Sequence, residues 1–397
     1  MIYKLVSIAV LLFCINLNTT TAQVFKGTVV DDETGEPVPF STIFLTNTTL
    51  GVSADGEGRF SMNIPPGYYE VVIRMLGYEL MTFTIRTEEM ESSYEIRLIP
   101  DIKQLGEIKI EGDRDALWYR NLEIFKDYFL GTSDNAKNCI ILNPEVMVFD
   151  SESEESVLTA RAVDVIKIKN PKLGYEIDYI LLQFKLDSNS NEVFFKGYPS
   201  YKNMPKYESR LPRRIVKNRE KAYNGSIHHF LRSVYFDTAE EEGYLIRQVK
   251  MVPNPERPSD ELIANAKKKM NEIKDFAEKE SLYRNYVSKE RLAKFISEGD
   301  STYSDSEVFT RKTQDGQLLF QFEDLLEVTY TKEKTEPAYW GNPHYAYPKF
   351  QMSLLRMTVP YTIINHQGVT YNPFDIFLLG YMGWEKMGDM MPIDYIP

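Results

Sequence analysis

Residues 24–100 alternate apolar and polar side chains with a period of two, and this pattern constrains the fold more than any other feature of the chain. Successive side chains of an extended strand point to opposite faces, so one face can be buried while the other meets water. The clearest examples are the segments 59–64, 69–75 and 94–98. Turns rich in glycine and proline, as at 31–37 and 54–58, separate such segments. Roughly six or seven short strands at this spacing predict a β-sandwich.

Four motifs within this stretch point to a known family. They are FKGTVVD at 25–31, TGEPVPF at 34–40, DGEGRF at 55–60 and LGYE at 76–79. Together they resemble the carboxypeptidase-regulatory-like domain, which implies an all-β sandwich of the prealbumin or immunoglobulin type over residues 23–100. Further segments, at 219–232 and 391–395, resemble secreted two-part bacterial proteins named only for this domain. Because such sandwiches accompany many unrelated partners, the resemblance implies a docking module and no activity.

Residues 1–22 have the pattern of a secretory signal peptide. Lys4 precedes the apolar run 5–15, and Thr20-Thr21-Ala22 forms a small-residue cleavage site before Gln23. The run is too short to span a bilayer comfortably, and no later stretch predicts an integral membrane span. We therefore expect an exported protein of the periplasm or associated with the outer membrane.

The rest of the chain predicts a linker at 101–112 and a mixed α+β domain of unknown function at 113–397. Helical spacing of apolar residues appears at 114–130 and again from 262 to 277, where Ser259 is placed to cap the helix. Alternating segments return between these helices and after them. The strand-like segments are 157–169, 174–186, 318–322, 327–331 and 351–359.

Composition narrows the function classes. A hydrophobic fraction of 43% and a charged fraction of 26% fit a folded globular protein, and a net charge of −12 gives no reason to expect a nucleic-acid partner. One segment reverses this acidity: residues 196–232 contain ten basic side chains against Glu208 and Glu220. The sequence leaves the oligomeric state open.

The residues that catalysis or metal binding would need do not form known motifs. The histidines are His228, His229, His344 and His366, and none is followed by the glutamate of a zinc-protease motif. Ser226 lies in the wrong frame for a hydrolase nucleophile and is better explained as a helix cap. Cys139 follows no neighbouring histidine, so we expect a buried, unreactive thiol. We therefore predict no catalytic residue, no metal ligand and no cofactor.

Two groups of residues are candidates for binding. The first is the basic, tyrosine-containing stretch, represented by Arg213, Arg214, Lys217, Arg219 and Tyr223. Because Pro212 restricts the residue before it to extended forms, Arg213 and Arg214 are expected to stand out on a loop. The alternative is that the bases pair internally with acids such as those at 152–155 and 240–242.

The second group lies in an aromatic loop with glycine and proline, and comprises Trp340, His344, Tyr345 and Tyr347. Exposed rings in such a loop stack on sugars or contact a protein, and the alternative is a loop held to the core by its own aromatics. The leading hypothesis is a non-enzymatic cell-envelope protein whose sandwich docks while the larger domain binds an envelope protein or glycan. The alternative is an unrecognised hydrolase of polysaccharide or peptide, which would need a deep cleft with convergent carboxylates.

Overall fold

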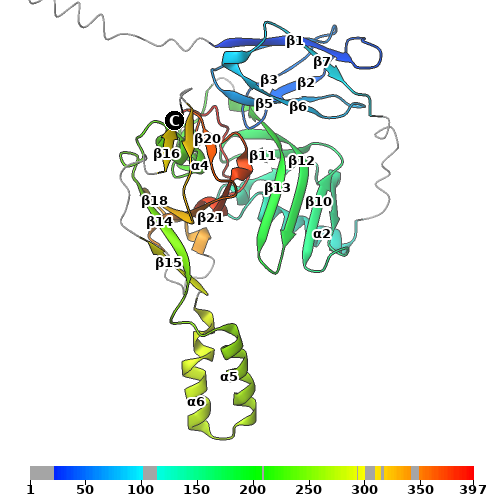
Figure 1. The fold of residues 1–397 in the computed structure, drawn as a ribbon. Coiled ribbons are helices and arrows are strands. Elements are labelled where there is room, and N and C mark those ends of the chain that lie inside the picture. The colour runs from blue at the N-terminus through cyan, green and yellow to red at the C-terminus, as the bar shows by residue number, and fades with distance from the viewer. Residues whose placement is uncertain are drawn as a thin grey trace, which may run out of the picture. The chain divides into compact units, whose positions relative to one another are not determined.

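The computed structural model describes residues 22–101, 114–207, 210–292, 294–299, 309–313, 317–340 and 348–397 (Figure 1). The chain forms two compact units: unit 1 comprises Met1–Glu220 and Lys386–Pro397, and unit 2 comprises Lys221–Glu385. The expected signal peptide and the expected linker lie almost wholly outside the described residues, and both remain predictions. Within the described part of the chain, no helix is both long and apolar enough to cross a bilayer.

Unit 1 begins with the predicted β-sandwich. Its first sheet has the order β4 (Arg59–Ile64), β1 (Gln23–Asp31) and β7 (Tyr94–Leu98). Its second sheet has the order β3 (Gly51–Ser53), β2 (Thr42–Leu45), β5 (Tyr68–Arg74) and β6 (Met81–Arg86). β4 runs antiparallel to β1, whereas β7 runs parallel to it. The predicted alternation determines which side chains enter the core. Along β4, Phe60, Met62 and Ile64 are buried and their neighbours are exposed.

A six-stranded sheet follows in the same unit. Its path is β8 (Ile140–Ile141), β11 (Ile166–Asn170), β12 (Tyr175–Asp187), β10 (Val157–Ala162) and β9 (Met147–Asp150), and β13 (Glu192–Asn203) also pairs with β12. The helix α2 (Ala116–Phe129) packs on this sheet through aromatic rings. Phe125 meets Phe184 and Phe129 meets Tyr179, each with ring centroids 4.8 Å apart.

Unit 2 contains two antiparallel sheets. The larger has the order β15 (Phe295–Gly299), β14 (Tyr244–Pro253), β18 (Leu325–Lys334), β19 (Phe350–Met357) and β21 (Ile376–Gly380). The smaller has the order β16 (Thr310–Lys312), β17 (Leu318–Phe320) and β20 (Thr362–Ile364). The helix α4 (Ile227–Tyr235) contributes Phe230 and Leu231 to their common core, and α7 (Tyr381–Trp384) follows β21. The expected α+β character of the later chain is confirmed.

A helical hairpin extends from the β14–β15 end of unit 2 (Figure 1). Ser259 caps α5 (Asp260–Glu272) as predicted, its side chain accepting from the backbone N–H of Leu262. The helical spacing expected to run on to residue 277 is interrupted, because the Asp275 side chain accepts from two backbone N–H groups and starts α6 (Phe276–Asn285). The hairpin is thus two short helices.

Candidate functional site

The basic candidates lie at the start of α3 (Arg213–Tyr223). Arg213 and Arg214 are exposed, but they belong to the first turn of this helix, so the prediction of a loop is wrong. The carbonyl of Pro212 accepts from the backbone N–H groups of Ile215 and Val216, at 2.9 and 3.2 Å. Proline restricts the residue that precedes it, whereas its own fixed φ suits the beginning of a helix.

The inner face of α3 is held to unit 1 by Arg219, which is only 4% exposed. Its Nε donates to the carbonyl of Leu173 and its Nη2 to Oδ1 of Asn203, both at 2.7 Å. The guanidinium group also lies 3.7 Å from the ring centroid of Tyr175. Arg219 is therefore a structural residue inside the unit, which corrects its assignment to an external binding surface.

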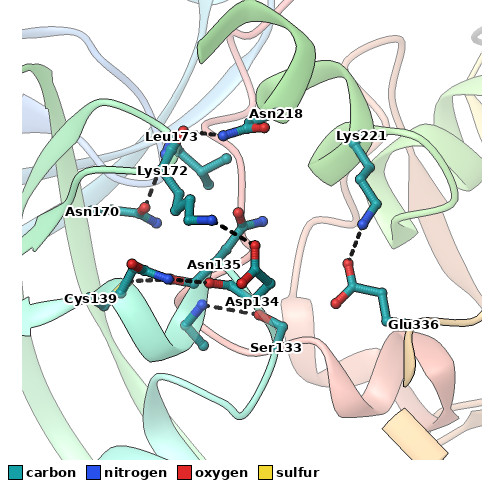
Figure 2. Close-up of polar contacts among 12 residues, drawn as sticks. Ser133, Asp134, Asn135, Cys139, Asn170, Lys172, Leu173, Asn218, Lys221 and Glu336 are labelled. Atoms are coloured by element: carbon teal, nitrogen blue, oxygen red, sulfur yellow. Dashed lines mark hydrogen bonds and ion pairs between the residues drawn. The ribbon is translucent and has the colours of Figure 1, made fainter. Parts of the chain in front are cut away.

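Asn218 adds a second bond between α3 and the turn that precedes β12. Its Nδ2 donates to the carbonyl of Lys172 at 2.9 Å, while Nζ of Lys172 pairs with Asp134 at 2.7 Å (Figure 2). The turn itself is fixed by Asn170, whose Oδ1 accepts from the N–H of Leu173 (Figure 2). With this side anchored, the opposite side of α3 faces solvent.

The solvent-facing side of α3 presents Arg213, Arg214 and Lys217, which we call the cationic face. Within the part of the chain that the structure describes, none of the three pairs with a carboxylate. The first turn contains no acidic residue, although the helix dipole favours anions there. Arg213 and Lys217, spaced i,i+4, repel each other by about 0.2–0.5 kcal/mol. The electrostatics of this helix start therefore favour an added anion.

Other bases of the stretch are occupied within the chain. Lys202 pairs with Asp178 at 3.2 Å. Lys221 pairs with Glu336 at 2.5 Å (Figure 2). Nζ of Lys206 lies 4.8 Å from the ring centroid of Tyr207. Internal pairing thus accounts for part of the basic stretch. The partners of Lys202 and Lys221 are Asp178 and Glu336, not the acids at 152–155 and 240–242 that the sequence suggested.

Tyr223 is buried in unit 2 and does not join the cationic face. Its hydroxyl accepts from Nη1 of Arg232 at 3.0 Å, and its ring lies 4.9 Å from that of His229. Ser226 caps α4 as interpreted from the sequence, because its Oγ accepts from the N–H of His229 and donates to the carbonyl of Tyr223. Engaged in this way, Ser226 acts as a cap.

The aromatic candidates are only partly described. Trp340 is 37% exposed, and its Nε1 donates to Oγ1 of Thr335 at 2.7 Å, which attaches the start of the loop to unit 2. His344, Tyr345 and Tyr347 lie outside the described residues.

Cys139 is partly buried in unit 1. Burial raises the pKa of its thiol to about 12, and the nearby carboxylate of Asp389 adds to this shift. The thiol therefore stays protonated at neutral pH and is a poor nucleophile, as expected from the sequence. Over the described ranges, no three His, Cys, Asp or Glu side chains lie where they could share a metal ion.

Sequence reasoning missed a half-open cleft of about 350 Å³ in unit 2. Gln248 and Leu326, opposite each other on β14 and β18, contribute to its lining together with Gln321, Phe322 and Glu323. The available signal was a break in a buried row, because the apolar positions Tyr244 and Ile246 of β14 are followed by the polar Gln248. A polar side chain at the next position of a buried row indicates that the row has reached solvent.

Comparison with known families decides the identity of the sandwich. Residues 25–110 match the model of the CarboxypepD_reg-like domain. The N-terminal sandwich is a carboxypeptidase-regulatory-like domain. The resemblance inferred from its four motifs is thereby confirmed, and the regulatory-like domain accounts for only part of unit 1. No curated protein matches the chain.

Solved structures give weak superpositions. The 3-chlorocatechol 1,2-dioxygenase of Rhodococcus opacus has 16% identity and a TM-score of 0.18. The match covers 22% of this chain and 62% of the dioxygenase. A candidate carbohydrate-binding protein of Bacteroides uniformis has 12% identity and a TM-score of 0.17, over 47% of this chain and 82% of its own. A candidate membrane-associated protein of unknown function from Bacteroides fragilis has 7% identity and a TM-score of 0.17, and the match covers 89% of this chain and 92% of that protein. At such TM-scores the superpositions carry no argument about function.

Proposed function

We propose that this chain is a non-enzymatic binding protein of the cell envelope, and that its cationic face engages the phosphate groups of an anionic envelope lipid. The observation that supports the proposal is the exposure of Arg213, Arg214 and Lys217 on a helix anchored from behind by Arg219. In a chain of net charge −12, such a face orients the protein on an anionic surface, because the rest of the molecule is repelled.

Phosphate suits the chemistry of this face. An arginine guanidinium binds phosphate oxygens through two parallel hydrogen bonds, which a lysine ammonium cannot reproduce. Backbone N–H groups of a helix's first turn favour an anion in the same place. Each basic residue near an anionic membrane contributes about 1 kcal/mol, so three of them give weak, reversible and salt-sensitive attachment.

The sandwich serves as a docking module in this proposal, through the β4-β1-β7 sheet, where Arg59, Ser61 and Asn63 of β4 and Glu95 and Arg97 of β7 are exposed. Phe44 of β2 and Val72 of β5 already pack against Tyr198 of β13, so this face of the second sheet is used inside the chain. Docking would therefore fall to the β4-β1-β7 sheet. Export to the envelope belongs to the same proposal and rests on the signal-peptide pattern of residues 1–22.

The hydrolase alternative finds less support in the cleft of unit 2. Glycoside hydrolysis commonly needs two carboxyl groups on either side of the scissile bond, about 5–10 Å apart. Glu323 is the one carboxylate among the described residues that line the cleft. A single carboxylate can bind hydroxyl groups but cannot divide the acid and base roles.

Co-sedimentation with lipid vesicles tests the proposal. The mature chain should bind phosphatidylcholine vesicles containing phosphatidylglycerol at low salt, lose binding at high salt, and ignore pure phosphatidylcholine. Arg213→Ala with Arg214→Ala should abolish binding without changing thermal stability, and Arg213→Lys with Arg214→Lys should retain part of it.

Lys268→Ala with Lys269→Ala provides the matched control, since both side chains are exposed on α5 and the change in net charge is identical. Unchanged binding by the arginine variant, or equal loss by the control, would overturn the proposal. Direct binding of soluble polyphosphate without any vesicle binding would assign the face to free phosphate polymers instead of a lipid.

A further inference from the structure

The cleft of unit 2 opens where the chain crosses from the smaller sheet to the larger one. Residues 321–324 make this crossing between β17 and β18, and the N–H of Gln321 donates to the carbonyl of Phe309 at 2.9 Å. Asp324 adopts a positive φ of 54°, which turns the chain into β18. We infer that this cleft is a binding site for a neutral sugar ring, independent of the cationic face.

One wall of the cleft is a supported aromatic ring. Phe322 is partly buried against the core, and its ring centroid lies 5.4 Å from that of Phe320. Phe320 in turn meets Phe309 edge to face at 5.7 Å. This chain of rings holds Phe322 in place, so its remaining surface offers a preformed apolar plane. The C–H face of a pyranose ring is apolar and packs on such a plane.

Polar groups surround this aromatic wall. Nε2 of Gln248 donates to the carbonyl of Glu323 at 3.0 Å, which fixes the amide in the cleft. The side chains of Gln321 and Glu323 are exposed beside it. Amides both donate and accept hydrogen bonds, and a carboxylate accepts from two hydroxyl groups at once. A few polar groups around an apolar wall are typical of small-molecule sites, and hydroxyl-rich rings match this set.

Charge and volume narrow the ligand class. Glu323 gives the cleft a negative charge, and the adjacent Asp324 is already paired with Lys250 at 3.4 Å, so an anionic sugar would be repelled. The volume of about 350 Å³ lies at the small end of ligand sites, which span about 300–1,000 Å³. The cleft therefore fits one end of a neutral oligosaccharide.

Saturation-transfer NMR of the mature chain with maltotriose, cellotriose and chitotriose at millimolar concentration tests this inference. At least one of the three should receive saturation from the protein. Gln321→Ala with Glu323→Gln should weaken binding about tenfold or more, the fold-change expected for losing hydrogen bonds worth about 1.4 kcal/mol. Phe322→Ala should abolish it.

Glu241→Gln is the matched control, because this glutamate is exposed in unit 2 and does not line the cleft. Gln321 and Glu323 are exposed, so their variants keep the test meaningful even where Phe322→Ala fails to fold. Absence of saturation transfer to all three sugars, or equal binding by the Gln321/Glu323 variant and the control, would overturn the inference. Arg213→Ala with Arg214→Ala should leave sugar binding intact, which separates this site from the lipid proposal.

Discussion

The backbone N–H of Ile393 donates to the carbonyl of Asn47 at 2.8 Å, joining residues far apart in the chain within unit 1. The next residue, Asp394, accepts from the N–H and the hydroxyl of Thr49. Residues 386–397 thereby bind the β2–β3 turn of the regulatory-like domain. The same segment donates from Gly388 to the carbonyl of Leu130 at 2.8 Å, so one stretch of chain links the sandwich to the end of α2.

Gly388→Ala should destabilise unit 1 through this segment. A Cβ at this position would lie 2.6 Å from Cα of Ala136 and 2.7 Å from the carbonyl oxygen of Leu130, closer than packed atoms allow. Overpacking of this kind costs about 1–3 kcal/mol. Gly56→Ala is the control, because its added Cβ would meet no atom within 4 Å. Chemical denaturation should show a lower free energy of unfolding for Gly388→Ala only. Amide exchange should likewise show weaker protection of α2 in that variant only.

The regulatory-like domain, residues 23–100, is predicted to fold alone because its two sheets close their own core. The isolated fragment should be about 1–3 kcal/mol less stable than in the chain, since Phe44 and Val72 lose the cover that Tyr198 provides. Thermal unfolding monitored by circular dichroism checks this expectation. A fragment without a cooperative transition would show that the sandwich depends on β13.

The sequence predicted several elements from local chemistry, although it missed the helix starts that Pro212 and Asp275 make. Period-two alternation gave the strands of the sandwich, and the caps Ser226 and Ser259 marked the starts of their helices. It also failed where the deciding partner is distant. In the sequence, Arg219 is one more basic residue of the stretch. Its structural role depends on hydrogen bonds to Leu173 and Asn203, which other parts of the chain contribute.

The cationic face and the cleft differ in how far they could be predicted. The basic composition around Arg213 and Arg214 is visible in the sequence, whereas their place in a helix depends on Pro212 starting α3. The cleft was not foreseen, because Gln248 and Glu323 come together only when the crossing segment meets β14. Such convergence depends on tertiary structure, and no spacing of residues along the sequence indicates it.

Arg219→Lys should lower the free energy of unfolding by about 2–4 kcal/mol, because a buried site built for a guanidinium is left with unpaired acceptors. The ammonium group cannot serve the carbonyl of Leu173 and Oδ1 of Asn203 while covering the ring of Tyr175. Arg213→Lys on the exposed side of the same helix is the control and should change stability by less than about 0.5 kcal/mol. Denaturant titration compares the two, and equal stabilities would contradict the structural role of Arg219.

The stability of unit 2 should fall as the solution is acidified, and His228 is one cause. Burial lowers the pKa of this side chain from 6.5 to about 4, and the positive charge of Arg232 adds to the shift. In the folded protein the ring therefore stays neutral until about pH 4, whereas in the unfolded chain it takes up a proton near pH 6.5. Between these values the unfolded state binds the extra proton, so the free energy of unfolding decreases as pH falls.

His228→Asn isolates this contribution, because asparagine carries no titrating group. The wild type should lose about 2 kcal/mol more than the variant between pH 7 and pH 4, less than the full pKa shift implies because the residue keeps some contact with solvent. The difference should be absent above pH 7, where the ring is neutral in both states. Urea unfolding of both proteins across this range measures it. Parallel pH profiles would mean that His228 ionises equally in the folded and unfolded states, and that the acid sensitivity of unit 2 arises from other groups.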